Sequence, residues 1–265
     1  MSLSEKRIGF IGCGKMGQAL IRGLVDSEAT NGVRIMGYDT ADFNWPEMLT
    51  KWGASPAKSN PEVVVLAVQP QYAADALAEI KDHSAGKLII SIVAGLTTKT
   101  IEKSLDPKAR VVRVMPNTPA LVRQGASAVA PGASATKHDL SLAKQLMSNV
   151  GLVVIEKEGN MDAVTGMSGT GPAFVFLFLD GLIGAGVRLG LSWDVAKTLA
   201  YQTVKGAAVL AQQSDQHVAQ LKDDVTSPGG TSAAGLYVLE GAGFKAMIAQ
   251  AVEAAAKRSE ELGRQ

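Results

Sequence analysis

Residues Arg7–Gly17 read RIGFIGCGKMG, a short apolar run that leads into the pattern Gly-x-Gly-x-x-Gly. The continuation, KMGQALIRGLVDS, repeats apolar residues every three or four positions, as an amphipathic helix does. A strand that turns through such glycines into a helix is typical of dinucleotide binding, because the glycines allow a tight turn and let a pyrophosphate approach the helix N-terminus. The stretch therefore predicts that a dinucleotide contacts Gly12, Gly14, Lys15, Met16 and Gly17.

Asp39 stands where a dinucleotide-binding unit needs an acid. It ends the second apolar run, Val33–Asp39, about 20 residues beyond the glycines. Its carboxylate is expected to accept hydrogen bonds from the ribose hydroxyls and to repel a 2′-phosphate, which favours NADH. No Lys or Arg follows before Lys51, so the sequence shows no cationic clamp for NADPH. A solvated loop acid is the alternative interpretation.

The alternation of short apolar runs with helical stretches continues to about residue 158 and predicts an α/β fold. Because the runs are apolar on both faces, they suit a parallel sheet covered by helices. They lie at residues 33–39, 62–70, 87–95, 109–116, 126–130 and 152–158. Beyond them, helical patterns cover residues 171–190, 193–213, 217–224, 231–240 and 244–262. We predict a Rossmann-like N-terminal domain with a predominantly parallel sheet, residues 1–159, and an all-α C-terminal domain, residues 160–265.

Composition points to a small-molecule partner. Lys and Arg total 26 against 25 Asp and Glu, without long runs of either sign, so neither nucleic acid nor an anionic membrane is expected. The single cysteine, Cys13, excludes an internal disulfide and fits a reducing compartment, and the three histidines lack metal-ligand spacing. The cysteine and histidine counts make a metal site unexpected. The first residues lack the apolar core of a signal peptide, so we expect a cytoplasmic protein.

One apolar stretch, Pro172–Val187, resembles a membrane span in composition. It is shorter than the roughly 20 residues that a span needs and contains Asp180, so a buried helix is expected instead. The stretch is apolar nearly all round, which a small helical domain would struggle to bury alone. The pattern therefore suggests a partner chain.

Three further loops are candidate ligand contacts. AVQP (Ala67–Pro70) and VMPNTP (Val114–Pro119) follow predicted strands at the carboxyl edge of the sheet, where ligands bind in open α/β folds. A small-residue turn at residues 168–171 precedes Pro172 and suits a helix start beside the cofactor. As plain turn or packing residues these would look much the same. The ligand-binding residues predicted from these loops are Ala67, Val68, Gln69, Pro70, Asn117, Ser168 and Thr170.

The stretch VTSPGGTSAAG, residues Val225–Gly235, places a proline, two glycines and two hydroxyls directly before a helical pattern. A turn followed by a helix cap explains it simply. A second explanation is an anion site, because a helix N-terminus preceded by small residues leaves backbone N–H groups open to a carboxylate.

Six motifs together resemble, in order, those of the pyrroline-5-carboxylate reductases: GFIGCGKMG, AVQP, SIVAGLT, VMPNTP, DAVTGMSGTGPAF and LKDDVTSPGGT. The resemblance spans residues 7 to 262 and implies an NADPH- or NADH-dependent oxidoreductase that converts 1-pyrroline-5-carboxylate into L-proline, the last step of proline biosynthesis. It also implies a homodimer formed through the helical domain and is compatible with a decameric ring of dimers.

The resemblance assigns the substrate carboxylate to the loop containing Ser227, Gly229 and Gly230, with Asn117 as a further contact. A family threonine two places after the glycine pair donates a hydrogen bond to the ring nitrogen. Here Ser232 occupies that place and Thr231 precedes it, so both are candidates for the catalytic hydroxyl. The chain departs from the family at two further positions: Gln69 replaces a lysine and Asp224 replaces an amide.

Two other functions remain open at this stage. A related Rossmann and helical oxidoreductase acting on imines or β-hydroxyacids usually carries an acid on the first long helix of its second domain, where this chain offers only Asp180. A non-catalytic redox sensor would bind NAD(H) but would leave the SPGG loop without a function. His217 is expected to be a surface or cap residue, and Lys222 a solvated one.

Overall fold

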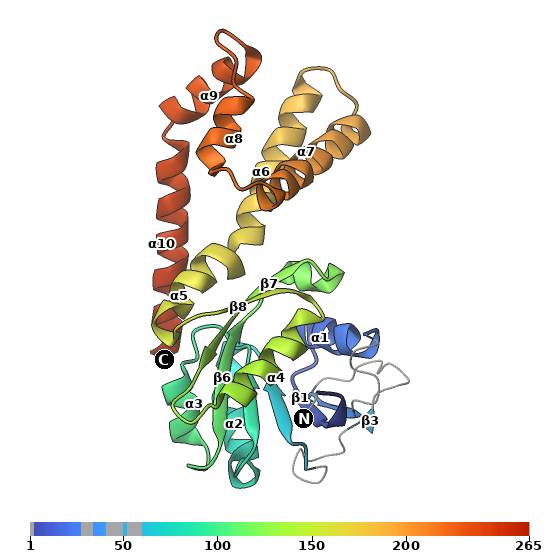
Figure 1. The fold of residues 1–265 in the computed structure, drawn as a ribbon, viewed down its shortest axis with the longest axis vertical. Coiled ribbons are helices and arrows are strands. Elements are labelled where there is room, and N and C mark those ends of the chain that lie inside the picture. The colour runs from blue at the N-terminus through green and yellow to red at the C-terminus, as the bar shows by residue number, and fades with distance from the viewer. Residues whose placement is uncertain (1–2, 28–33, 41–49, 52–59, 265) are drawn as a thin grey trace. The chain divides into compact units, whose positions relative to one another are not determined.

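The computed structural model describes residues 3–27, 34–40, 50–51 and 60–264. The chain divides into two compact units (Figure 1). The first unit contains Met1–Thr170 together with Val252–Gln265, and the second contains Gly171–Ala251. The predicted boundary after residue 159 remains a prediction, and the C-terminal segment returns to the first unit.

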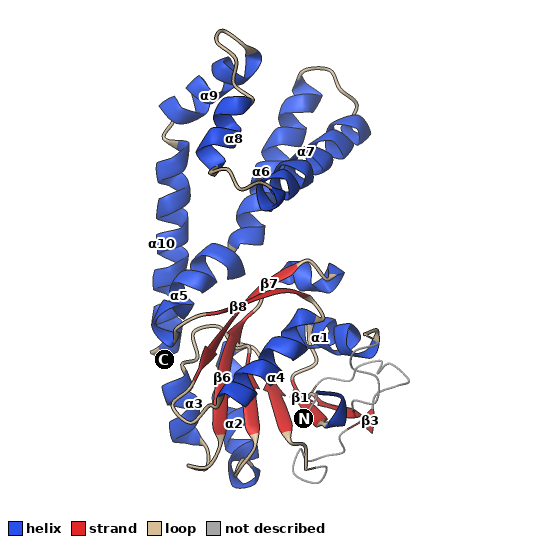
Figure 2. Cartoon of the chain, viewed as in Figure 1, coloured by secondary structure: helices blue, strands red, loops and turns tan. Residues whose placement is uncertain are grey.

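The first unit is built on one eight-stranded sheet (Figure 2). Its strands are β1 (Arg7–Ile11), β2 (Arg34–Tyr38), β3 (Thr50–Lys51), β4 (Val63–Leu66), β5 (Leu88–Ser91), β6 (Arg110–Met115), β7 (Gly125–Pro131) and β8 (Gly151–Ile155). Their order is β3-β2-β1-β4-β5-β6-β7-β8, and every neighbouring pair is parallel except β6 and β7. The predominantly parallel Rossmann-like sheet is therefore confirmed, and β3 is an addition to it.

Two helical layers cover this sheet. On one face lie η1 (Leu3–Glu5), α1 (Lys15–Val25) and α4 (Lys137–Ser148); on the other lie α2 (Ala73–Ile80) and α3 (Thr98–Ser104). Side chains alternate along each strand, as the pleat requires. In β4, Val63 and Val65 pack towards α1 and α4, while Val64 and Leu66 pack towards α2 and α3. Burial on both faces explains the nearly continuous apolar runs of the sequence.

A buried charge network joins β6 to the C-terminal helix α10 (Phe244–Gly263). Arg113 of β6 has only 2% of its side chain exposed and contacts Glu158 Oε1 at 3.1 Å and Asp162 Oδ1 at 3.4 Å. Glu158 lies in η7 (Glu158–Asn160), and Asp162 lies in α5 (Met161–Val164). Ser259 of α10 donates a hydrogen bond of 2.7 Å to the same Asp162 oxygen. The network fixes the end of α10 within the first unit.

The segment Thr165–Gly169, η8, is a π-helix, and α6 begins at Gly171, so the turn predicted at residues 168–171 is not formed as expected. Thr170 donates both its N–H, at 2.8 Å, and its Oγ1 hydroxyl, at 3.0 Å, to the carbonyl oxygen of Thr165. Gly166 packs directly on α10, because a Cβ there would lie 2.5 Å from the carbonyl oxygen of Val252. The wider helical turn thus fits tightly between α5 and α10.

The second unit is entirely helical, as predicted, with α6 (Gly171–Arg188), α7 (Trp193–Gln213), α8 (Val218–Asp224), α9 (Thr231–Gly241) and the first part of α10. Ile183 of α6 packs on Ala196 and Ala200 of α7. Ile183 is, however, the only buried residue of α6. The expectation of a buried helix is therefore wrong within one chain, because Ile183 packs on α7 while the other residues of α6 stay partly or fully exposed.

Large apolar side chains remain exposed across the second unit, including Phe176, Leu177, Leu199, Tyr237 and Val238. Over the described residues, one helical stretch, 158–188, is long and apolar enough to cross a membrane by length and composition alone, and 6% of its most apolar window is buried. Apolar patches of this extent mark interaction surfaces in soluble proteins as well as membrane contacts.

Candidate active site

The glycine loop between β1 and α1 shows a separate physical reason for each glycine. Gly12 has φ +90°, and a Cβ there would lie 2.6 Å from the backbone of Ala67. A Cβ at Gly17 would lie 2.5 Å from the carbonyl oxygen of Gly12. A Cβ at Gly14 would meet nothing within 4 Å. Gly12 and Gly17 therefore pack the turn, whereas Gly14 keeps open the space that a pyrophosphate would approach.

The N-terminus of α1 is open. Its cap residue, Gly14, offers no side chain, so backbone N–H groups of the first turn remain available to an anion. The loop is held from other directions: Gln18 Nε2 donates to the Cys13 carbonyl at 2.9 Å, and the Cys13 N–H donates to Asp39 Oδ2 at 2.6 Å. Asp39 thus positions the loop backbone as well as standing where a ribose would bind.

A pocket of about 340 Å³ adjoins this loop and has the size of a small-molecule site. It gathers residues predicted from separate motifs: Gly12, Gly14, Asp39, Ala67, Val68 and Gln69. Lys15, Met16 and Gly17 lie in the adjoining first turn of α1, and Pro70 opens η4 (Pro70–Tyr72). The structure thus brings the glycine loop, Asp39 and the AVQP turn together, as their places at the carboxyl ends of neighbouring strands predict.

The same pocket has acidic and aromatic walls that sequence analysis missed. Tyr38, Tyr72, Asp75 and Glu79 line it, and none of its described lining residues is Lys or Arg. The negative charge of Glu79, together with burial and a hydrogen bond, raises the pKa of Tyr38. The sequence could have indicated these acidic residues, because Asp75 and Glu79 are four residues apart on the helix that follows AVQP and therefore share one helix face.

Cys13 lies inside the glycine loop but is not poised for reaction. Burial raises the pKa of its thiol to about 12, with the charge of Asp39 adding to the effect. We expect the native protein to leave Cys13 unmodified by a disulfide reagent at neutral pH, because thiolate is the reactive form. Unfolding in guanidinium should release one rapidly reacting thiol. Equal labelling rates in native and unfolded protein would contradict this expectation and would favour a redox role for Cys13.

Asn117 is buried at the start of η6 (Thr118–Val122), the turn that follows β6. Its Nδ2 donates to the Ser168 carbonyl at 3.1 Å, and its Oδ1 accepts from the Ala126 N–H at 2.8 Å. Asn117 and Ser168, predicted as ligand contacts from two different motifs, are thus joined to each other. The amide fixes the turn to the π-helix, and direct contact of either residue with a ligand remains a prediction.

The SPGGTS loop forms a tight turn in the second unit. Gly229 has φ +68°, and a Cβ on Gly230 would lie 2.3 Å from Ser227 Oγ. Gly230 caps α9 without a side-chain hydrogen bond, and Thr231 and Ser232 are the first two residues of the helix. Because the first-turn N–H groups have no side-chain acceptor, the turn presents them beside three hydroxyls. This is a suitable cradle for a small carboxylate.

The polar residues before this loop make ion pairs and hydrogen bonds with residues outside it. Lys222 Nζ lies 3.3 Å from Glu240 and 3.4 Å from Asp223, so its charge is balanced locally. Asp224 Oδ1 accepts a hydrogen bond from Gln220 at 2.8 Å, within α8. His217 caps α8, with Nδ1 accepting from the Ala219 N–H at 3.2 Å. The expectation that His217 is a surface cap is confirmed.

A parallel sheet with a glycine loop at its first βα turn, an acid at the end of β2 and an appended helical unit defines a Rossmann-type dinucleotide-dependent oxidoreductase. Two family models match the chain: "NADP oxidoreductase coenzyme F420-dependent" over residues 7–95 and "Pyrroline-5-carboxylate reductase dimerisation" over residues 158–262. The second match covers the helices whose apolar side chains are exposed.

Full-length relatives identify the family. The chain is 40% identical to a pyrroline-5-carboxylate reductase of Methanosarcina acetivorans, covering 99% of this chain and 100% of that protein, and 39% identical to one of Arabidopsis thaliana, covering 97% and 95%. The crystal structure of pyrroline carboxylate reductase from Plasmodium falciparum with NADP bound aligns with a TM-score of 0.90 at 36% identity, covering 99% of this chain and 100% of that one. The chain belongs to the pyrroline-5-carboxylate reductase family.

Proposed function

We propose that this protein reduces 1-pyrroline-5-carboxylate to L-proline with a nicotinamide dinucleotide, the last step of proline biosynthesis. The observation that carries the proposal is the uncapped N-terminus of α9, where the SPGGTS turn presents backbone N–H groups and hydroxyls. This arrangement matches a substrate with one carboxylate and one ring nitrogen. The glycine loop, with open space at Gly14, provides for the cofactor's pyrophosphate. The bound cofactor supplies a hydride.

The substrate carboxylate binds at the first turn of α9. The N-terminal end of a helix carries partial positive charge and unpaired N–H donors, both of which favour an anion. Ser227, Gly229 and Gly230 shape the turn around that anion. The pairing of Lys222 with Glu240 and Asp223 leaves backbone dipoles and hydroxyls as the main attraction. A site of this kind also discriminates against imines that lack the carboxylate.

The imine carbon is electrophilic once its nitrogen carries a proton, so little acid–base machinery is required. Ser232 or Thr231 holds the hydrogen bond to the ring nitrogen and thereby fixes the ring. These residues raise the rate by orienting the substrate ring and by holding a hydroxyl dipole in place at the ring nitrogen. Asn117 holds the η6 turn against Ser168 and keeps this edge of the sheet in one conformation.

The experiment that tests the proposal measures initial rates of NADH and NADPH oxidation with 1-pyrroline-5-carboxylate at neutral pH, and identifies the product as proline. Turnover to proline establishes the reductase. Turnover with other cyclic imines or with β-hydroxyacids only would favour a related oxidoreductase. Nucleotide binding without oxidation of either cofactor by any of these substrates would favour a redox sensor.

We propose further that NADH is the preferred cofactor. Asp39, Asp75 and Glu79 line the pocket beside the glycine loop, and its described walls contain no cation. A 2′-phosphate placed there would face three carboxylates, and like charges brought together are costly. Gln69, at the family's lysine position, adds no positive charge.

We therefore expect kcat/KM with NADH to exceed that with NADPH by about tenfold or more, since one such charge clash is worth at least about 1.4 kcal/mol. Replacing Asp75 and Glu79 together by serine should reduce this ratio, mainly by improving NADPH. Asp82→Ser, which removes an acid outside the pocket, is the matched control. A wild-type preference for NADPH would contradict the assignment of this pocket to the ribose.

We also propose that the protein is a cytoplasmic homodimer through its second unit. The exposed apolar side chains of α6, α7 and α9 support this arrangement, because a second copy would cover them, and the same helices match the dimerisation family model. A decameric ring of such dimers is the larger assembly we propose. Light scattering after size exclusion should give a mass that is an even multiple of 27.6 kDa.

A further inference from the structure

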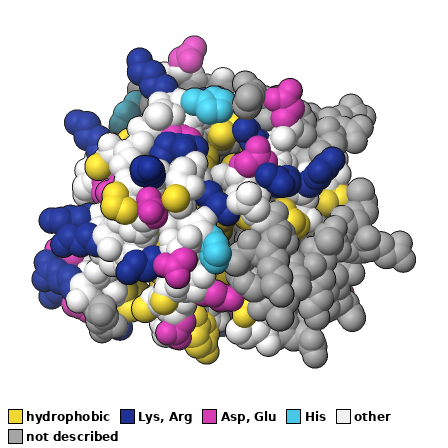
Figure 3. Space-filling view, turned by 90° about the horizontal axis from the view of Figure 1, so that it is seen from below, with side chains coloured by type: hydrophobic (Ala, Val, Ile, Leu, Met, Phe, Trp, Pro, Cys, Tyr) yellow, Lys and Arg dark blue, Asp and Glu magenta, His cyan; other side chains and the backbone are white. Residues whose placement is uncertain are grey.

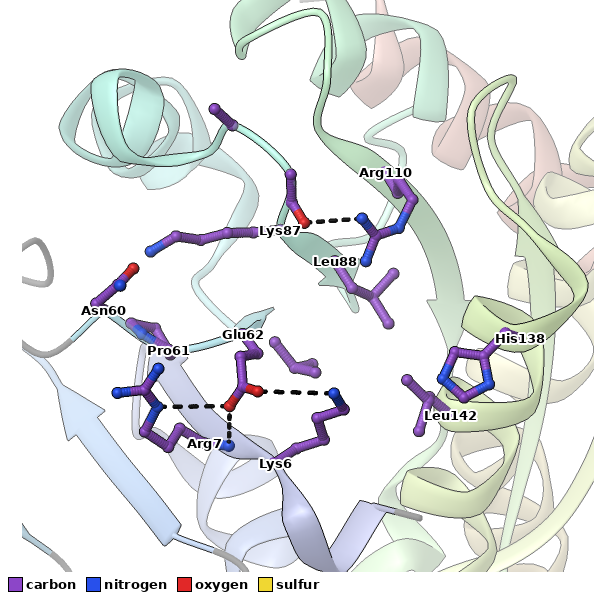
Figure 4. Close-up of a pocket in the computed structure, with 13 residues that line it drawn as sticks. Lys6, Arg7, Asn60, Pro61, Glu62, Lys87, Leu88, Arg110, His138 and Leu142 are labelled. Carbon is purple, nitrogen blue, oxygen red and sulfur yellow. Dashed lines mark hydrogen bonds and ion pairs between the residues drawn. The ribbon is translucent and has the colours of Figure 1, made fainter. Parts of the chain in front are cut away.

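A second pocket, of about 310 Å³, lies at the amino ends of the parallel strands, on the edge of the sheet away from the glycine loop. Four cationic side chains line it: Lys6 and Arg7 at the start of β1, Lys87 before β5 and Arg110 at the start of β6. His138 of α4 also lines it. Figure 4 shows Lys87 and Arg110 along one side, Lys6 and Arg7 along another, and His138 at a third.

Two carboxylates pair with three of the four cations at this pocket. Glu62 lies between two of them, 3.6 Å from Lys6 Nζ and 3.4 Å from Arg7 Nε. Asp139 pairs with Arg110 at 3.0 Å. Lys87 Nζ makes no hydrogen bond or ion pair with any residue that the structure describes. Of the four cations that line the pocket, Lys87 is the one without an ion pair to any described residue.

The surroundings of Lys87 make its ammonium group costly to keep charged. Burial lowers the pKa of Lys87, and the nearby charge of Arg7 lowers it further. A bound anion would relieve both effects. Arg110 Nη1 is fixed by the Gly86 carbonyl at 2.7 Å, so its guanidinium is already held at the pocket. Charged groups that are ordered before binding lose less entropy when a ligand arrives.

The shape of the pocket favours a small ligand over a polymer. Its walls include apolar side chains, among them Pro61, Leu88 and Leu142, and its volume falls in the small-molecule range. Figure 3 looks onto this lower face of the molecule and shows described Lys and Arg side chains interspersed with Asp and Glu. The broad basic surface typical of nucleic-acid binding does not extend across these side chains.

We propose that this pocket binds a small phosphate compound, with Lys87 as a principal contact. A phosphate group carries about 1.5 to 2 negative charges near pH 7 and concentrates them on one group, which suits a space lined by four cationic side chains. Its oxygens can accept from several donors at once. The site lies apart from the glycine loop, so such a ligand and the dinucleotide can bind together.

Calorimetric titration of inorganic phosphate into the full-length protein tests the proposal. Saturating NADH and constant ionic strength exclude binding at the glycine loop and general salt effects. We expect saturable binding by the wild type, weakened at least about tenfold in Lys87→Gln. Lys103→Gln, which removes an exposed lysine from α3, should bind phosphate as the wild type does. Thermal melting checks that both variants are folded.

Absence of saturable heat in the wild type would overturn the proposal, as would equal binding by the two variants. Malonate, a dicarboxylate of similar charge, serves as the competing probe, and binding as tight as that of phosphate would overturn the phosphate assignment. These readouts require no turnover. A failure of the proposed reductase activity therefore does not affect the phosphate test. Likewise, a failure of phosphate binding does not affect the test of reductase activity.

Discussion

Replacing Ser232 with alanine is expected to lower kcat for reduction of 1-pyrroline-5-carboxylate by about 100-fold, because loss of one hydrogen-bond donor at a reacting centre typically costs 10²–10³ in rate. Ser232 is the second residue of α9, and its hydroxyl makes no hydrogen bond within the described part of the chain. The substitution should therefore leave the melting temperature nearly unchanged. Steady-state kinetics at saturating substrate, with thermal melting alongside, measures both effects.

Substitutions at two neighbouring residues test which hydroxyl contacts the ring nitrogen and which contacts the carboxylate. Thr231→Ala alters the preceding hydroxyl, and Ser227→Ala alters the turn that we assign to the carboxylate. The latter should raise KM for the substrate more than it lowers kcat, because carboxylate binding contributes in both the ground state and the transition state. A large loss of kcat in Thr231→Ala, with an unchanged rate in Ser232→Ala, would move the nitrogen contact to Thr231. Unchanged kinetics in all three variants would refute the assignment of the loop.

Two glycine substitutions in one loop are expected to have opposite effects. Gly14 has φ −64° and open space where a Cβ would stand, so Gly14→Ala should fold normally. Its methyl group would occupy the cradle of the pyrophosphate, and we expect KM for NADH to rise by about tenfold or more, which corresponds to about 1.4 kcal/mol of lost affinity. Titration of NADH, followed by nicotinamide fluorescence, measures the loss.

Gly12→Ala should instead damage the fold. Its φ of +90° strains any residue with a side chain, and the new Cβ would lie 2.6 Å from the Ala67 backbone. Strain and overpacking together are expected to lower the free energy of unfolding by about 3 kcal/mol or more. Urea denaturation of both variants separates the two effects. Loss of stability in Gly14→Ala, or a stable Gly12→Ala protein, would contradict the division of roles.

Much of the fold follows from local sequence patterns. Each of the predicted apolar runs overlaps a strand, and the five predicted C-terminal helices are present with their ends shifted by a few residues at most. The direction of β7 was not predicted, although it has a local cause. The connection through η6 is too short for the crossover that parallel strands need, which takes a dozen or more residues.

Features that depend on distant contacts could not be predicted from single motifs. The π-helix at Thr165–Gly169 is stabilised by its fit against α10, and Arg113 is buried because Glu158 and Asp162 reach it from later elements. The small residues 168–171 were predicted to form a turn, and the first two of them end the π-helix instead. Sequence alone therefore did not predict the backbone conformation of this motif.

Candidate site residues were predictable to different degrees. The glycine pattern carries its own spacing rule, so the cofactor loop could be recognised directly. No spacing rule predicts the positions of Asp75 and Glu79. They reach the pocket only because α2 lies beside β4. The ligand contact of Asn117 stays a prediction; its buried amide also bonds Ser168 and Ala126, a pairing across 51 and 9 residues that no local pattern encodes.

The return of the chain at residue 252 makes the second unit an insertion within the first. The last turns of α10 pack on the loop after β5, where a Cβ at Gly95 would lie 2.9 Å from the Gly263 nitrogen, and Ser259 bonds Asp162. A protein shortened after Ala251 would keep every predicted cofactor contact. It would lose the part of α10 that packs within the first unit, which contains those contacts. Conversely, a backbone cut inside the insertion leaves two fragments, each retaining part of the first unit through which they can reassociate.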